Sequence, residues 1–125
     1  MGREIPGAEI DVRKRAYYFS VKTIKYIDGL PTDLTGSVIA KQLVRSATSV
    51  GANLVEAKGA SSRKDFINFY SYSLKSANET LYWLGLLRDA KHFNGEQLIM
   101  LITEAQELSK MIGACIVSLK KPNNI

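Results

Sequence analysis

Few side chains in this sequence are of the types that carry metal or nucleophilic chemistry. There is one histidine, His92, and one cysteine, Cys115. A metal site needs several converging His, Cys or carboxylate ligands, and the Glu-x-x-His pairs that hold two irons in helical bundles do not occur. A serine nucleophile needs a base, and His92 has no obvious carboxylate partner beside it. We therefore expect no catalytic residue, no metal and no cofactor, and we predict that the protein is not an enzyme.

Structural roles account for both residues. His92 lies near the end of a predicted helix, where a positive charge favours the negative end of the helix dipole. Cys115 falls on the apolar side of another predicted helix and is expected to be a buried thiol. One cysteine cannot form an internal disulfide, which favours a reducing, cytoplasmic setting. The longest apolar stretches are too short to span a bilayer, so we expect no membrane partner.

Polar residues of unusual type form a stripe along the segment 36–58. Gln42, Arg45, Ser49, Asn53 and Glu56 recur at spacings of three and four, which places them on one face of a helix. Ser and Asn are poor helix formers, so their presence on this face indicates hydrogen bonding rather than simple solvation. We predict that Arg45, Asn53 and Glu56 are mostly buried, with Glu56 supplying the counter-charge of Arg45 directly or through a neighbouring helix.

The segment 63–91 offers a matching polar set, which comprises Ser73, Ser76, Glu79 and Thr80. Two such faces packed together would satisfy one another's hydrogen bonds, within one bundle or between subunits. The predicted structural polar network comprises Arg45, Ser49, Asn53, Glu56, Ser76 and Glu79. Direct contact of the stripe with nucleic acid is the alternative.

Positive charge gathers in one part of the chain. The formal net charge is +5, and residues 35–64 contain one acid, Glu56, against several cations. Lys58, Arg63 and Lys64 flank a predicted helix start, whose free backbone N–H groups also favour phosphate. The candidate nucleic-acid-binding residues are Lys58, Arg63, Lys64 and Lys41, and the cluster Arg13, Lys14 and Arg15 could extend this surface. Such contacts would reach backbone phosphates and would weaken steeply with salt.

Hydrophobic residues recur at helical spacing through most of the chain, and strand-like alternation is weak. The pattern predicts four helices, over about 11–28, 36–58, 63–91 and 95–119. Ser62 and Asn94 have the type and spacing of N-terminal caps for the last two. Because short connections make consecutive helices antiparallel, we predict an all-α fold, an antiparallel up-down four-helix bundle. It would form one domain over 1–125, with a flexible N-terminus and C-terminal tail.

Aromatic residues are concentrated on the predicted third helix. Its expected apolar seam is Ile67, Tyr70, Leu74, Ala77, Leu81 and Leu84. The aromatic side chains of this helix, together with Tyr17 and Tyr18 of the first, cover more of the helix circumference than one seam requires. Some should therefore be exposed, either in a protein interface or for stacking on unpaired bases.

The stripe also carries a family resemblance. The segment 42–56, Gln-Leu-Val-Arg-Ser-Ala-Thr-Ser-Val-Gly-Ala-Asn-Leu-Val-Glu, resembles the pattern Gln-Leu-Arg-Arg-Ala-x-x-Ser-Ile-x-x-Asn-Ile-x-Glu-Gly. That pattern is the signature of bacterial four-helix-bundle proteins encoded by intervening sequences of 23S rRNA genes, historically labelled S23 ribosomal proteins. The segment 65–70, with Ser76 and Glu79, is similar to the third helix of the family. Two departures are Ala57 and Lys75, where the family usually or often has glycine.

The resemblance implies a homo-oligomer, with a ring of five subunits as the usual arrangement. A distant relative, the accessory protein of diversity-generating retroelements, is a basic pentamer that associates with a reverse transcriptase and nucleic acid. Together with the basic surface, the resemblance favours an RNA-binding or other nucleic-acid-binding protein without enzymatic activity. The alternative is a protein-binding scaffold or accessory subunit, for example of a reverse transcriptase, without direct nucleic-acid contact.

Overall fold

The computed structural model describes residues 6–31 and 33–122. The described residues form four helices and no strand: α1 (Pro6–Asp28), α2 (Leu34–Ala57), α3 (Arg63–Asp89) and α4 (Glu96–Lys120). The expected all-α fold of four helices is confirmed. The first helix begins at Pro6, earlier than the expected start near 11, and proline suits a first helical position because its missing N–H needs no partner there. The ends of the chain that were expected to be flexible lie largely outside the described residues.

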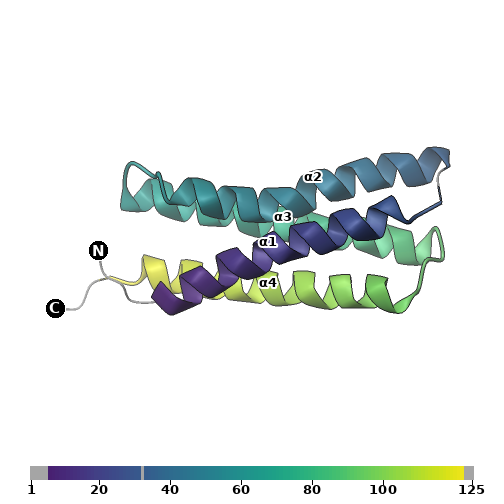
Figure 1. The fold of residues 1–125 in the computed structure, drawn as a ribbon. Helices are drawn as coiled ribbons and strands as arrows, with labels where there is room; N and C mark the ends of the chain where they lie inside the picture. Colours follow the sequence, from purple (N-terminus) through teal and green to yellow (C-terminus); the bar gives the residue numbers. More distant parts are fainter. Residues whose placement is uncertain (1–5, 32, 123–125) are drawn as a thin grey trace.

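Successive helices run in opposite directions along a shared long axis (Figure 1). Helix α1 packs against α2 and α4, and α3 packs against the same two helices. As a result α1 begins, α2 passes into α3, and α4 ends at one end of the bundle (Figure 1). The connections from α1 to α2 and from α3 to α4 lie at the opposite end. None of the described helices is long and apolar enough to cross a membrane.

The core follows the apolar seams of α2 and α4 closely. Along α2 the buried seam residues are Leu43, Ala47, Val50, Leu54 and Ala57. Along α4 they include Leu98, Leu101, Ala105, Leu108, Ile112 and Cys115. Cys115 is 4% exposed, as expected of a structural thiol. Local periodicity therefore predicts which sides of these two helices face inward.

The seam expected for α3 is partly wrong. Ile67, Leu74 and Leu81 are only partly buried, whereas Ser73 and Thr80 are fully buried. The helix is rotated so that these small polar residues face α2, where their hydroxyl groups find hydrogen-bond partners. Burial of a satisfied hydroxyl costs little, so this orientation brings the two helices together without an unpaired polar group.

The helix ends combine expected and unexpected caps. The Ser62 hydroxyl accepts a hydrogen bond from the Asp65 N–H at 3.0 Å, which confirms the predicted cap of α3. Asn94 is not the cap of α4, because Gly95 occupies that position and provides no side-chain hydrogen bond. His92 lies beyond the end of α3 in a left-handed backbone conformation with φ 59°, which turns the chain toward α4.

Candidate nucleic-acid interface

The polar stripe of α2 faces outward from the bundle. The predicted burial of Arg45 and Glu56 is therefore wrong for the single subunit. The Arg45 side chain is 55% exposed, and Glu56 is exposed. The reason is the position of the seam: Leu43, Ala47 and Leu54 face inward, which leaves Arg45 and Glu56 on the far side of the helix.

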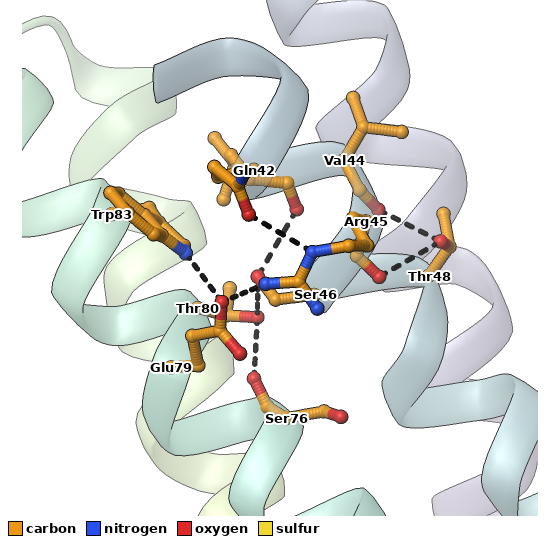
Figure 2. Close-up of polar contacts among 10 residues, drawn as sticks. Gln42, Val44, Arg45, Ser46, Thr48, Ser76, Glu79, Thr80 and Trp83 are labelled. Carbon is orange, nitrogen blue, oxygen red and sulfur yellow. Dashed lines mark hydrogen bonds and ion pairs between the residues drawn. The ribbon is translucent and has the colours of Figure 1, made fainter. Parts of the chain in front are cut away.

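The counter-charge of Arg45 is Glu79 of α3 rather than Glu56 (Figure 2). The Arg45 guanidinium pairs with Glu79, and its Nε donates to the Gln42 amide oxygen at 3.0 Å. The same Glu79 oxygen accepts the Trp83 indole N–H at 2.9 Å. Glu79 therefore joins α2 to α3 at the surface, whereas the network was predicted to be mostly buried.

The other predicted members are not joined to this ion pair. The Asn53 amide donates to the Ser49 carbonyl at 2.9 Å, which is a local contact along α2. The Ser76 carbonyl accepts the Thr80 hydroxyl at 2.7 Å, a local contact along α3. Within the described part of the chain, the Glu56 carboxylate has no hydrogen-bond or ion-pair partner. Within a single subunit, the residues predicted to form one network therefore make several separate contacts instead.

A smaller polar network does lie inside the bundle, between α2 and α3. The Ser73 hydroxyl donates to the Val50 carbonyl at 2.7 Å. The Thr80 and Ser46 hydroxyl groups are 2.9 Å apart, and all three side chains are fully buried. The spacing of seven between Ser73 and Thr80, which places them on one side of α3, was the available sequence signal.

Five cations gather at the end of the bundle where α2 passes into α3. Lys58 follows α2, and Arg63 and Lys64 open α3. The end of α4 brings Lys120 and Lys121 to the same place, which the sequence analysis missed. Arg63, Lys64, Lys120 and Lys121 line a cavity of about 660 Å³, which we call the end pocket. Within the described ranges, no Asp or Glu lines the end pocket.

Lys41 lies elsewhere. It is exposed on α2, on the same helix as Lys58 but roughly 25 Å from it along the axis, at 1.5 Å per residue. It therefore does not join the basic end. Arg15 is also engaged: its Nε and Nη2 donate to the Glu104 carboxylate at 2.9 and 2.7 Å, which links α1 to α4. Arg15 therefore stabilises the packing of α1 against α4 and does not extend the basic surface.

Arg63 has a structural contact that the sequence did not indicate. Its Nε and Nη2 donate to the Leu119 carbonyl at 3.1 and 2.5 Å. Carbonyl groups in the last turn of a helix lack partners, and a cation there also favours the helix dipole. Arg63 therefore holds the end of α4 against the start of α3, and phosphate contacts fall mainly on the lysines.

The start of α3 is less open to phosphate than predicted. The Ser62 hydroxyl accepts the Asp65 N–H, and the Asp65 carboxylate accepts the Ser61 N–H at 3.1 Å. A helix start that is capped and carries an acid attracts phosphate only weakly. The lysine side chains, rather than the backbone N–H groups, are the phosphate-binding groups of this end.

The rest of the described surface includes a second pocket of about 580 Å³ on α1 and α4, with Tyr26, Ile99 and Met100 among its lining residues. Among residues 6–31 and 33–122, no three His, Cys, Asp or Glu side chains gather as a metal site would require. Four tyrosines, Tyr17, Tyr18, Tyr72 and Tyr82, are at least half exposed, as the excess of aromatic residues predicted. Within this range, lysine-rich and aromatic surfaces are the features suited to partners.

Comparison with known proteins gives two findings. The family described as 23S rRNA-intervening sequence protein matches residues 8–114. A crystal structure of a protein of unknown function from the S23 ribosomal protein family of Bacteroides thetaiotaomicron is similar to this chain. The two share 35% sequence identity and a TM-score of 0.81, over 88% of this chain and 98% of the other. No functionally curated protein is similar enough to count as a relative.

Proposed function

Because this chain belongs to the 23S rRNA-intervening sequence protein family, we propose that it is a non-enzymatic protein of that type that binds structured RNA. The observation that carries the proposal is the basic end of the bundle. Lys64 at the start of α3 and Lys120 and Lys121 at the end of α4 meet there around one pocket, and Lys58 follows α2 at the same end. A local excess of positive charge attracts the phosphate backbone of nucleic acid.

The proposed contact is made to phosphates. Lys58, Lys64 and Lys120 are exposed, and each is a flexible point charge. Contacts of this kind position a nucleic acid without reading its sequence, so the affinity depends on shape and on salt. We therefore expect tight binding at low salt, little discrimination between sequences, and a steep loss of affinity as salt rises.

Assembly into a homo-oligomer, as a ring of five, is part of the proposal. Large apolar side chains are exposed on every helix, among them Tyr82 at 62% and Val55 at 60%. Val55 lies beside the outward stripe of Arg45, Asn53 and Glu56, which subunit contacts would cover. In a ring the basic ends would repeat around one rim, so that weak phosphate contacts add through multivalency.

The test is an RNA-binding titration by fluorescence anisotropy at several salt concentrations. The triple change Lys58→Ala, Lys64→Ala, Lys120→Ala should weaken binding and reduce the slope of log affinity against log salt by about 2. The matched control is the triple change Lys22→Ala, Lys25→Ala, Lys75→Ala, which removes the same charge from exposed positions away from the basic end. Equal effects of the two triple variants would remove this end from the proposed interface.

The second candidate function is a protein-binding scaffold or accessory subunit. It is favoured by the outward stripe of α2, where the family signature residues Arg45 and Glu56 are exposed and Asn53 is half-buried. Exposed motif residues suit recognition of a protein partner, such as a reverse transcriptase. Failure of the wild-type protein to bind any RNA at low salt would favour this function.

A further inference from the structure

We propose that the end pocket holds one unpaired nucleotide of the bound RNA, at a strand end or in a bulge. This inference rests on the proposed function and specifies which form of RNA the protein binds. The pocket is a partly open depression with a volume of about 660 Å³, within the range of roughly 300–1,000 Å³ typical of sites that take small ligands. The phosphates of a continuous duplex lie on a convex surface and reach only the rim of such a site.

An unpaired nucleotide matches the geometry because it can be splayed out of the helix. RNA-binding proteins that act on single-stranded positions stack the extruded base on aromatic or arginine side chains and form hydrogen bonds with its edges. A duplex does not present a separate base in this way. The shape of the end pocket therefore distinguishes between two forms of RNA that its charge alone would not separate.

The lining supplies each kind of contact that a nucleotide requires. Lys64, Lys120 and Lys121 are the phosphate ligands. Ile67 and Pro122 supply apolar surface for the base or the ribose. The Asn68 amide both donates and accepts, and the Ser71 hydroxyl does the same, which suits a base edge or a 2′-hydroxyl. Arg63 is a positioning residue, because its bond to the Leu119 carbonyl holds the α4 side of the pocket in place.

The test compares two RNA hairpins that have equal length and phosphate number. One ends in a short unpaired 3′ overhang, and the other has all of its stem nucleotides paired. Binding to the full-length protein is measured by anisotropy. We expect the overhang hairpin to bind about tenfold more tightly, which corresponds to one pocket contact of about 1.4 kcal/mol.

The decisive variant is Asn68→Trp, which fills the end pocket without altering its charge. Asn68 lies on an exposed position of α3, so the change is compatible with the fold. We expect it to abolish the preference for the overhang while the salt-dependent binding of the paired hairpin persists. The matched control, Asn94→Trp, makes the same change at an exposed position at the opposite end of the bundle and should keep the preference.

The outcomes separate this inference from the proposed function. Equal affinities for the two hairpins, or a preference that survives Asn68→Trp, would overturn the pocket assignment and leave phosphate binding intact. Absence of binding to both hairpins would overturn the proposed function itself. Tight binding of adenosine 5′-monophosphate alone, with no preference between hairpins, would assign the pocket to a free nucleotide and overturn the RNA assignment.

Discussion

Glu79 is the residue on which the exposed polar contacts between α2 and α3 depend. Its carboxylate serves two donors, the Arg45 guanidinium and the Trp83 indole N–H, from two different helices (Figure 2). Its side chain is 36% exposed, so solvent screens the ion pair but does not remove it. Glu56, on the same outward stripe as Arg45, carries no comparable contact.

We predict that Glu79→Ala and Glu56→Ala differ in stability. Loss of Glu79 leaves two donors without their acceptor and should lower the free energy of unfolding by about 1 kcal/mol. Loss of the exposed Glu56 should change it by less than about 0.5 kcal/mol. Urea unfolding of the two variants measures both values. A cost of about 3–5 kcal/mol for Glu56→Ala would instead place Glu56 in a buried charge pair across subunits.

Ser73 is the residue that tests the buried contacts between α2 and α3. Its hydroxyl is fully buried and donates to the Val50 carbonyl of the neighbouring helix. We predict that Ser73→Ala lowers the free energy of unfolding by about 1 kcal/mol, because a buried hydrogen bond is lost while helix propensity rises slightly. The control is Ser49→Ala on α2, a partly exposed serine whose hydroxyl makes no hydrogen bond within the described chain. A stability gain for both variants would contradict the prediction.

At the scale of the elements, one ion pair joins the α1–α2 connection to the α3–α4 connection, at the end of the bundle opposite the basic surface. The Lys91 ammonium donates to the Asp33 carboxylate at 2.6 Å, and Asp33 also caps α2 by accepting the Gly36 N–H at 2.8 Å. The hydrogen bond from Lys91, followed by the bond from Gly36, lowers the pKa of Asp33 below its ordinary value of 3.8. Lys91 and Asp33 thereby hold the α3–α4 connection against the α1–α2 connection.

The pKa of Asp33 predicts an acid-sensitive contribution to stability. Because the folded-state pKa is lower than the unfolded-state pKa, the contribution is complete above about pH 4 and is lost as pH falls through the folded-state value. Asp33→Asn keeps the cap but removes the charge. We expect the variant to melt at a lower temperature than the wild type at neutral pH, with the difference closing as the pH falls below about 4.

The control for this prediction is Asp28→Asn, at the exposed end of α1. An acid at a helix C-terminus opposes the helix dipole, so its removal should raise rather than lower stability at neutral pH. Melting curves followed by circular dichroism over the same pH range distinguish the two variants. A difference for Asp33→Asn that does not change with pH would show that the ion pair with Lys91 is not its cause.

At the scale of the whole molecule, charge and apolar exposure are separated in space. Lys58, Lys64, Lys120 and Lys121 gather at one end of the bundle, whereas the exposed tyrosines lie along its sides. Side-by-side association through the long faces would leave the basic ends free. This separation allows oligomer formation and RNA binding to occur on one chain without competition for the same residues.

We predict that the protein is not a monomer in solution. Light scattering at micromolar concentration should give a mass several times the monomer value of 13.9 kDa, and about five times that value for the proposed ring. The basic end takes no part in the proposed subunit contacts, so the Lys58→Ala, Lys64→Ala, Lys120→Ala variant should keep the same mass. A mass near 13.9 kDa across a dilution series would contradict the oligomer.

The sequence by itself determined the features that depend on residues three or four positions apart. Four helices, the buried seams of α2 and α4, and the Ser62 cap all follow from local spacing and capping chemistry. The concentration of charge around residues 58–64 was equally visible. Each of these is a property of one helix or one helix end, so no knowledge of its neighbours was required.

Only the tertiary structure decided how the helices are rotated and which helix ends meet. It pairs Arg45 with Glu79, 34 positions away, and Arg63 with the Leu119 carbonyl, 56 positions away. It also turns Ser73 and Thr80 inward and brings Lys120 beside Lys64. Helical periodicity defines an apolar side but not its exact rotation, because small satisfied hydroxyl groups can be buried as readily as apolar groups. The end pocket joins helix ends from distant parts of the chain, so packing of the whole bundle had to create it.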